Sequence, residues 1–133
     1  MKITVDTNVL LRDSLHDDPR QARIAGMALR KAEEIVIPLT VFCEFVWVLR
    51  RGYKISAADV ANAIEQLIST SNVVTNRPAV EAGLATLAAG GDFADGVIAF
   101  EGKQLGAGEF VSFDEKAVSI LNSQGVQTRL LSK

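Results

Sequence analysis

The stretch Lys2-Ile3-Thr4-Val5-Asp6-Thr7-Asn8-Val9-Leu10-Leu11 decides which fold this chain is expected to adopt. Its first residues are rich in β-formers and end at a polar turn that begins with Asp6. The apolar residues after this turn indicate a brief helix. The stretch therefore predicts a strand, a carboxylate at the carboxyl end of that strand, and then a helix.

Short strands and longer helices alternate along the rest of the chain. The further expected strands are 35–37, 73–75, 110–113 and 126–128, and the expected helices cover 19–34, 40–51, 56–69, 78–87, 92–103 and a segment that ends at Asn122. This alternation predicts a three-layer α/β/α domain with a short, mostly parallel sheet. The sequence contains no linker, repeat or low-complexity segment, so we expect a single domain over residues 1–133.

Two of the expected helices carry apolar residues at helical spacing. In the helix over 19–34, the spacing predicts one amphipathic face made of Ile24, Met27, Ala28 and Lys31. In the helix over 56–69, it predicts an apolar stripe made of Val60, Ala61, Ile64, Leu67 and Ile68.

The composition bears on the cellular compartment and on how the protein could bind nucleic acid. The formal net charge of −2 argues against a broad basic face for nucleic acid, but less against an enzyme that holds phosphates through metal ions. No apolar run reaches the roughly 18 residues that span a bilayer, and Met1 to Asp6 reaches a carboxylate too early for a signal peptide. The lone Cys43 cannot form an internal disulfide. We expect a cytoplasmic protein with no membrane partner.

Asp6 and Asp114 each follow an apolar run directly, at the expected carboxyl end of a strand. Ligands of parallel α/β sheets bind beyond this edge. An Asp at a strand-to-helix junction also commonly caps the helix, and taken singly the capping role is the more common one. Both roles stay open for each residue.

Glu44 lies in an apolar helix and has no basic residue at a spacing of three or four. An ionised Glu among apolar groups is costly unless a positive charge meets it. We favour a functional role for Glu44. A salt bridge to a distant Arg is the alternative.

Asp92 and Asp95 are spaced to lie on adjacent turns of one helix face. They also form a variant of the capping box, a purely structural role that suits Asp92 better than Asp95. The apolar run that begins at Val97 directs the start of this helix toward the core.

Clustered carboxylates repel one another and raise one another's pKa values unless cations neutralise them. Hard oxygen ligands suit Mg²⁺ or Mn²⁺. Zinc and Ser-His-Asp catalysis are not expected, because the one histidine, His16, lies in a solvated loop. Gly90-Gly91 interrupts a helix and does not form a phosphate-binding loop.

Four elements of the sequence together resemble the PIN domain family, in particular the VapC-type toxins of bacterial toxin–antitoxin pairs. They are Val5-Asp6-Thr7-Asn8-Val9-Leu10, Ile37-Pro38-Leu39-Thr40-Val41-Phe42-Cys43-Glu44, Asp92-Phe93-Ala94-Asp95-Gly96-Val97-Ile98-Ala99 and Ser112-Phe113-Asp114-Glu115-Lys116-Ala117. The resemblance spans nearly the whole chain, in the family's order and spacing, and it implies a PIN-like α/β fold.

The resemblance also implies a site. By position, the catalytic and metal-binding acids would be Asp6, Glu44, Asp95 and Asp114, with Asp92 as an auxiliary acid and Thr7, Asn8 and Ser112 as supporting hydrogen-bonding residues. Gly96 departs from the family pattern, in which a better helix former such as Ala is common. We expect it to loosen the first turn and to leave the carboxylates in place.

The activity implied by the resemblance is Mg²⁺- or Mn²⁺-dependent cleavage of RNA by metal-assisted phosphodiester hydrolysis. It further implies a cognate antitoxin and a homodimer, for which the apolar faces of the Glu44 helix and the 56–69 helix are candidate surfaces. The cations Arg12, Arg50, Arg51 and Lys54 are weaker candidates for binding the RNA backbone, and the last three equally fit a solvated helix end. Arg20 and Arg23 are similar candidates for RNA or antitoxin.

Three other classes of protein share parts of this pattern. A phosphatase of the haloacid dehalogenase type needs a second Asp where this chain has Asn8, and a receiver domain needs a mid-chain strand that ends at an Asp, whereas Asp59 lies in an expected helix. A catalytically inactive PIN-like protein that binds RNA or acts as a scaffold is the main alternative. The presence of all four matched acids argues against it.

Overall fold

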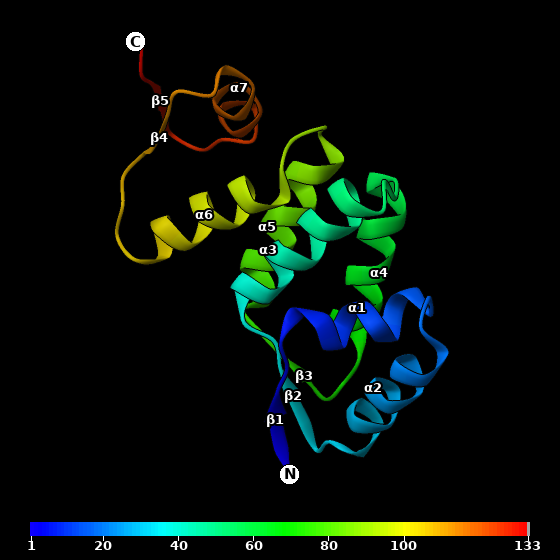
Figure 1. Ribbon diagram of the computed structural model, residues 1–133. Coiled ribbons are helices and arrows are strands. Elements are labelled where there is room, and N and C mark those ends of the chain that lie inside the picture. The colour runs from blue at the N-terminus through cyan, green and yellow to red at the C-terminus, as the bar shows by residue number, and fades with distance from the viewer. Residues whose placement is uncertain (133) are drawn as a thin grey trace. The chain divides into compact units, whose positions relative to one another are not determined.

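The computed structural model describes residues 1–132 (Figure 1), and the chain divides into two compact units, Met1–Asn76 and Arg77–Lys133. The N-terminal unit contains β1 (Lys2–Thr4), α1 (Thr7–Leu15), α2 (Pro19–Lys31), β2 (Glu34–Val36), α3 (Leu39–Trp47), the π-helical turn η1 (Val48–Gly52), α4 (Ala57–Ser69) and β3 (Val73–Val74). The C-terminal unit contains α5 (Arg77–Ala88), α6 (Phe93–Gln104), β4 (Phe110–Ser112), α7 (Glu115–Ser123) and β5 (Thr128–Leu130).

The N-terminal unit is built on a parallel sheet with the strand order β1-β2-β3. Ile3 is in register with Ile35, and Ile35 is in register with Val73. The apolar side chains of α1, α3 and α4 supply most of the core of this unit, which includes Leu10, Phe42, Phe45, Val60 and Ile64. The sheet positions the end of β1, and therefore Asp6, at the start of α1.

The C-terminal unit contains a second parallel pair, β4 with β5, in which Val111 is in register with Arg129. Helix α7 connects these strands and packs against both (Figure 1). Helices α5 and α6 pack closely at two glycines. A Cβ atom on Gly83 would lie 2.7 Å from the ring of Phe93, and one on Gly96 would lie 2.5 Å from the carbonyl oxygen of Ala82.

The predicted α/β class with short parallel strands is confirmed, since every strand pair in residues 1–132 is parallel and seven α-helices accompany them. The expectation of a single domain over residues 1–133 stays a prediction. No helix in the described part of the chain is long and apolar enough to cross a membrane.

The boundaries of the second helix and of the last strand differ from the sequence-based expectation by two or three residues. The helix expected over 19–34 ends at Lys31, because the next residues join the sheet, where Glu34 pairs with Lys2 across the β1–β2 ladder at 3.2 Å. The last strand is Thr128–Leu130 in place of 126–128. The backbone N–H of Val126 instead bonds to the carbonyl of Leu121 and closes the turn after α7.

The predicted buried face of α2 is wrong. Ile24 and Met27 are 56% and 43% exposed, whereas the buried residues are Ala22, Ala25 and Gly26. Small side chains let α2 approach α1 closely, so the packing uses the face with little side-chain volume and leaves the larger apolar residues outside. The stripe predicted on α4 is confirmed at Val60 and Ile64, which are fully buried.

The helix expected over 40–51 is two elements. Helix α3 begins directly after its N-cap residue, Pro38, and it continues as the π-helical turn η1. The N–H of Tyr53 donates to the carbonyl of Val48 at 3.2 Å, five residues back. Such turns are rare and often occur at functional sites.

Candidate metal site

Asp6 is the N-cap of α1. The backbone of Asp6 is extended, and its Oδ1 accepts a hydrogen bond from the N–H of Val9 at 3.2 Å. The carboxylate is exposed, so its second oxygen remains accessible. Asp6 therefore does cap α1, and this role leaves one carboxylate oxygen for a ligand. Thr7 and Asn8 occupy the first turn of α1.

Glu44 is exposed on α3, although Phe45 beside it is buried. The argument that apolar neighbours desolvate Glu44 is therefore wrong, because the side chain leaves the core face of the helix. An exposed carboxylate remains a usable ligand, and the assignment of Glu44 to the site stays a prediction. Cys43, next to it, is partly buried.

Asp92 and Asp95 occupy the start of α6. Asp92 is the N-cap and its Oδ1 accepts from the N–H of Ala94 at 3.1 Å. Asp95 lies in the first turn, and its own N–H donates to the carbonyl of Asp92 at 3.1 Å. The Asp95 carboxylate has no hydrogen-bond or ion-pair partner among the described residues of its unit, so the expected capping-box variant is not formed.

Asp114 is the N-cap of α7, with its Oδ1 accepting from the N–H of Ala117 at 3.0 Å. The hydroxyl of Ser112 accepts a hydrogen bond from the N–H of Asp114 at 2.9 Å. Ser112 thus shapes the turn between β4 and α7, and its supporting role in a metal site stays a prediction.

Asp95 is the carboxylate whose ionisation is most disturbed. Partial burial, followed by the negative charges of Asp92 and Asp114, raises the pKa of Asp95 above its usual range. The three acids are therefore electrostatic neighbours within the C-terminal unit. A divalent cation beside them would relieve this repulsion, and the all-oxygen donor set fits Mg²⁺ or Mn²⁺.

Neither unit alone brings three or more His, Cys, Asp or Glu side chains into metal-binding geometry within residues 1–132. His16 is exposed at the C-terminal end of α1, as expected of a solvated histidine.

The predicted cations are placed differently from one another. Arg50, Arg51 and Lys54 are exposed around η1, and one guanidinium nitrogen of Arg50 donates to the carbonyl of Ile55 at 3.1 Å. The Arg12 side chain is only 17% exposed and forms an ion pair with Asp17. Tyr53, whose hydroxyl oxygen accepts a hydrogen bond from Arg12, is not among the residues predicted from the sequence. The signal that could have indicated it is an aromatic residue inside a basic run.

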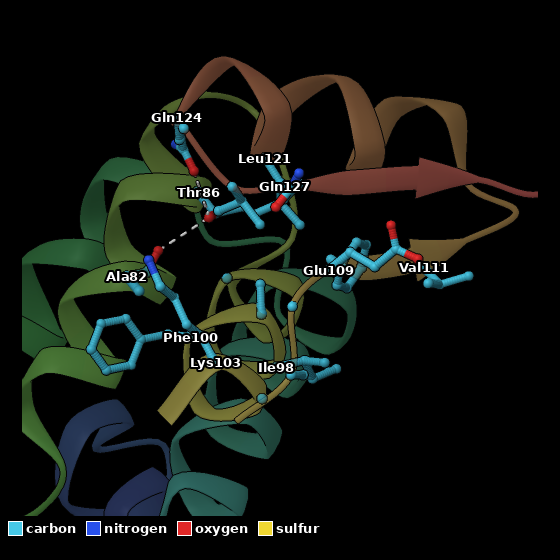
Figure 2. Close-up of a pocket in the computed structure, with 18 of the residues that line it drawn as sticks. Ala82, Thr86, Ile98, Phe100, Lys103, Glu109, Val111, Leu121, Gln124 and Gln127 are labelled. Atoms are coloured by element: carbon cyan, nitrogen blue, oxygen red, sulfur yellow. Dashed lines mark hydrogen bonds between the residues drawn. The ribbon is translucent and has the colours of Figure 1, made fainter. Parts of the chain in front are cut away.

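A cleft of about 660 Å³ lies within the C-terminal unit (Figure 2). Thr86 and Gln124 meet beside it, with the threonine hydroxyl 3.2 Å from Gln124 Oε1 and 3.1 Å from the carbonyl oxygen of Ala82. The amide nitrogen of Gln124 also donates to the carbonyl of Ala85 at 3.1 Å. None of the predicted acids lines this cleft, so it is separate from the candidate metal site.

These observations define an α/β protein with acids at the N-termini of its helices and a cluster of repelling carboxylates. The sequence model of the PIN domain matches residues 3–120, and the chain belongs to the PIN domain family. No curated protein matches the chain. PIN domains are generally nucleases that require metal, so a hydrolase of nucleic acid is the class of activity indicated.

Proposed function

We propose that this PIN domain protein is a Mg²⁺- or Mn²⁺-dependent endoribonuclease and the toxin of a VapC-type toxin–antitoxin pair. The observation that carries the proposal is the Asp95 carboxylate, which is partly buried beside Asp92 and Asp114 without a neutralising partner in its unit. A protein retains such a repelling arrangement at a cost in stability, and a bound cation is the simplest compensation.

In this proposal Asp6, Asp95 and Asp114 are the main metal-facing ligands. Glu44 binds the ion directly or through water, or holds the attacking water. Asp92 adds negative charge beside Asp95, while Thr7, Asn8 and Ser112 orient the ligands. A bound divalent ion would lower the pKa of its water and stabilise the charge that develops on the phosphate and the leaving oxygen.

The partners proposed for this activity are an RNA substrate, a cognate antitoxin protein and a second copy of the chain in a homodimer. The cytoplasm is the compartment in which such a toxin would meet RNA. These assignments extend the family resemblance.

The direct test is cleavage of a pool of RNAs by the purified chain, freed of antitoxin, with Mg²⁺, with Mn²⁺ and with EDTA. Divalent-dependent cleavage is expected, and Asp6→Asn or Asp95→Asn should reduce it by more than roughly a hundredfold. Glu65→Gln, at an exposed acid of α4, is the matched control and should cleave normally.

Sequencing of RNA ends after brief induction, beside an Asp6→Asn control, would identify the RNA that is cut. If correctly folded wild type cleaves no RNA with either metal, the alternative of a catalytically inactive RNA-binding or scaffold protein takes the place of this proposal.

A further inference from the structure

Tyr53 is held by two charged side chains of the N-terminal unit. Its hydroxyl group accepts a hydrogen bond from Arg12 Nη2 at 3.2 Å and donates one to Asp17 Oδ2 at 3.1 Å. Arg12 Nη1 closes the triangle with an ion pair to Asp17 Oδ1 at 2.8 Å. We call these three residues the Tyr53 triad. They come from α1, from the connection between α1 and α2, and from the segment after η1.

Unusual backbone conformations surround this triad. His16, next to Asp17, and Lys54, next to Tyr53, are the two non-glycine residues with positive φ in the part of the chain that the structure describes, at 57° and 54°. L-residues seldom adopt this conformation. The π-helical turn η1 lies directly before Tyr53. Rare backbone states of this kind often occur at binding sites, where the surrounding structure holds them in place.

The ring of Tyr53 remains accessible even though its hydroxyl group is fully engaged. The residue is 41% exposed although two hydrogen bonds engage its hydroxyl group, so Tyr53 is both anchored and open to solvent. A side chain fixed in this way loses little conformational freedom when a ligand binds to it.

Basic side chains flank the ring on both sides in the sequence. Arg50, Arg51 and Lys54 are exposed, and neither Arg51 nor Lys54 forms an ion pair within residues 1–132. An exposed aromatic residue with unpaired cations close to it in the sequence suits single-stranded nucleic acid, because a base can stack on the ring while phosphates meet the cations.

We propose that Tyr53, Arg51 and Lys54 form a binding surface for single-stranded RNA outside the carboxylates, with Tyr53 stacking on a base. Arg12 and Asp17 act as positioning residues that orient the ring, so Arg12 does not contact RNA itself. The inference deepens the proposed ribonuclease function by naming a surface that holds the substrate, and it rests on RNA being that substrate. Arg50 is partly committed to Ile55, so its contribution is smaller.

The test measures binding of a fluorescein-labelled oligouridine to the full chain by fluorescence anisotropy in EDTA, at several NaCl concentrations. EDTA removes the divalent cations that the proposed cleavage requires, so binding is measured separately from catalysis. Tyr53→Ala should weaken binding roughly tenfold, as expected for the loss of one stacked base. Tyr53→Phe retains the ring and loses its anchoring, so it should weaken binding roughly threefold with an unchanged salt slope.

Arg51→Ala and Lys54→Ala should each reduce the slope of log Kd against log[NaCl] by about 0.7, the value for one phosphate contact of a single strand. Lys31→Ala, at the C-terminal end of α2, removes the same charge and should leave the slope unchanged. Circular dichroism verifies that each variant is folded.

Folded Tyr53→Ala that binds oligouridine as tightly as wild type would overturn the proposal, as would wild type that ignores RNA and binds a polyglutamate peptide through Tyr53. RNA binding that depends on Tyr53, without cleavage in Mg²⁺ or Mn²⁺, would leave this surface standing and remove the nuclease assignment. Cleavage in Mg²⁺ or Mn²⁺ together with RNA binding that does not depend on Tyr53 would overturn this surface and retain the nuclease assignment.

Discussion

The backbone N–H of Asp95 donates to the backbone carbonyl of Asp92 at 3.1 Å, which places two carboxylates on the first turn of α6. Asp92 then caps the helix with its own side chain, while the Asp95 carboxylate has no such structural task. Burial, followed by the charges of Asp92 and Asp114, raises the pKa of Asp95. The local fold therefore disfavours the ionised form of the Asp95 carboxyl group.

Stability should depend on pH through Asp95. Because the pKa of Asp95 is higher in the folded than in the unfolded state, its contribution to stability is present below the unfolded pKa and is lost as the pH rises through the folded pKa. Asp95→Asn should therefore increase the free energy of unfolding at pH 7, and the gain should vanish near about pH 3. Urea denaturation at several pH values across this range measures the gain in the free energy of unfolding.

Asp59→Asn is the control for this series, because Asp59 is likewise an acid in the first turn of its helix, α4, but is exposed, whereas Asp95 is partly buried. Its replacement should give no gain that increases with pH. A lower stability of Asp95→Asn at neutral pH would mean that the repulsion around Asp95 is already compensated without metal.

Divalent cations should stabilise the wild-type chain. A cation that binds only the folded state at ten times its Kd adds about 1.4 kcal/mol to the free energy of unfolding. Thermal unfolding with increasing Mg²⁺ or Mn²⁺ should therefore raise Tm by a few degrees in wild type and leave Asp95→Asn unchanged. An equal rise in both proteins would indicate binding away from Asp95.

Asp114 has two separable roles, and two substitutions distinguish them. Asp114→Ala removes the N-cap bond to Ala117 and should cost about 1 kcal/mol of stability, whereas Asp114→Asn keeps an equally good cap. Both should lose RNA cleavage if Asp114 is a metal ligand. Urea denaturation gives the first quantity and an RNA cleavage assay the second. Normal cleavage by Asp114→Asn would restrict Asp114 to capping.

Local sequence signals predicted the parts of the structure that depend on local interactions. The β-rich run before Asp6 and the polar residues at helix starts indicated β1 and the N-caps Asp6, Asp92 and Asp114, because strand propensity and capping involve residues close in sequence. The same reasoning assigned Asp92 and Asp95 to one helix start.

Features that depend on distant residues could not be predicted in this way. Hydrophobic spacing selected Ile24 and Met27 as the buried face of α2, but close packing against α1 favoured Ala22 and Ala25. The bond between Arg12 and Tyr53 joins residues 41 positions apart, so no local pattern reveals it. The raised pKa of Asp95 likewise depends on burial and on Asp114, which belongs to another helix.

The sequence predicts that Gly96 loosens the first turn of α6, but the structure shows that glycine allows α6 to pack closely against α5. Gly96 is buried, and a Cβ atom there would lie 2.5 Å from both the Ala82 carbonyl oxygen and the Thr86 hydroxyl oxygen. Gly96→Ala should therefore destabilise the protein by up to about 2 kcal/mol, because an overpacking cost of about 1–3 kcal/mol exceeds the gain of about 1 kcal/mol in helix propensity.

Gly102→Ala in the same helix provides the matched comparison, since the nearest atom to its added Cβ would be that of Ala107 at 3.9 Å. This variant gains helix propensity without overlap and should be stabilised by up to about 1 kcal/mol. Urea denaturation of both variants separates the two effects. If Gly96→Ala is as stable as Gly102→Ala, α5 and α6 do not pack as closely in solution as the contacts at Gly96 require.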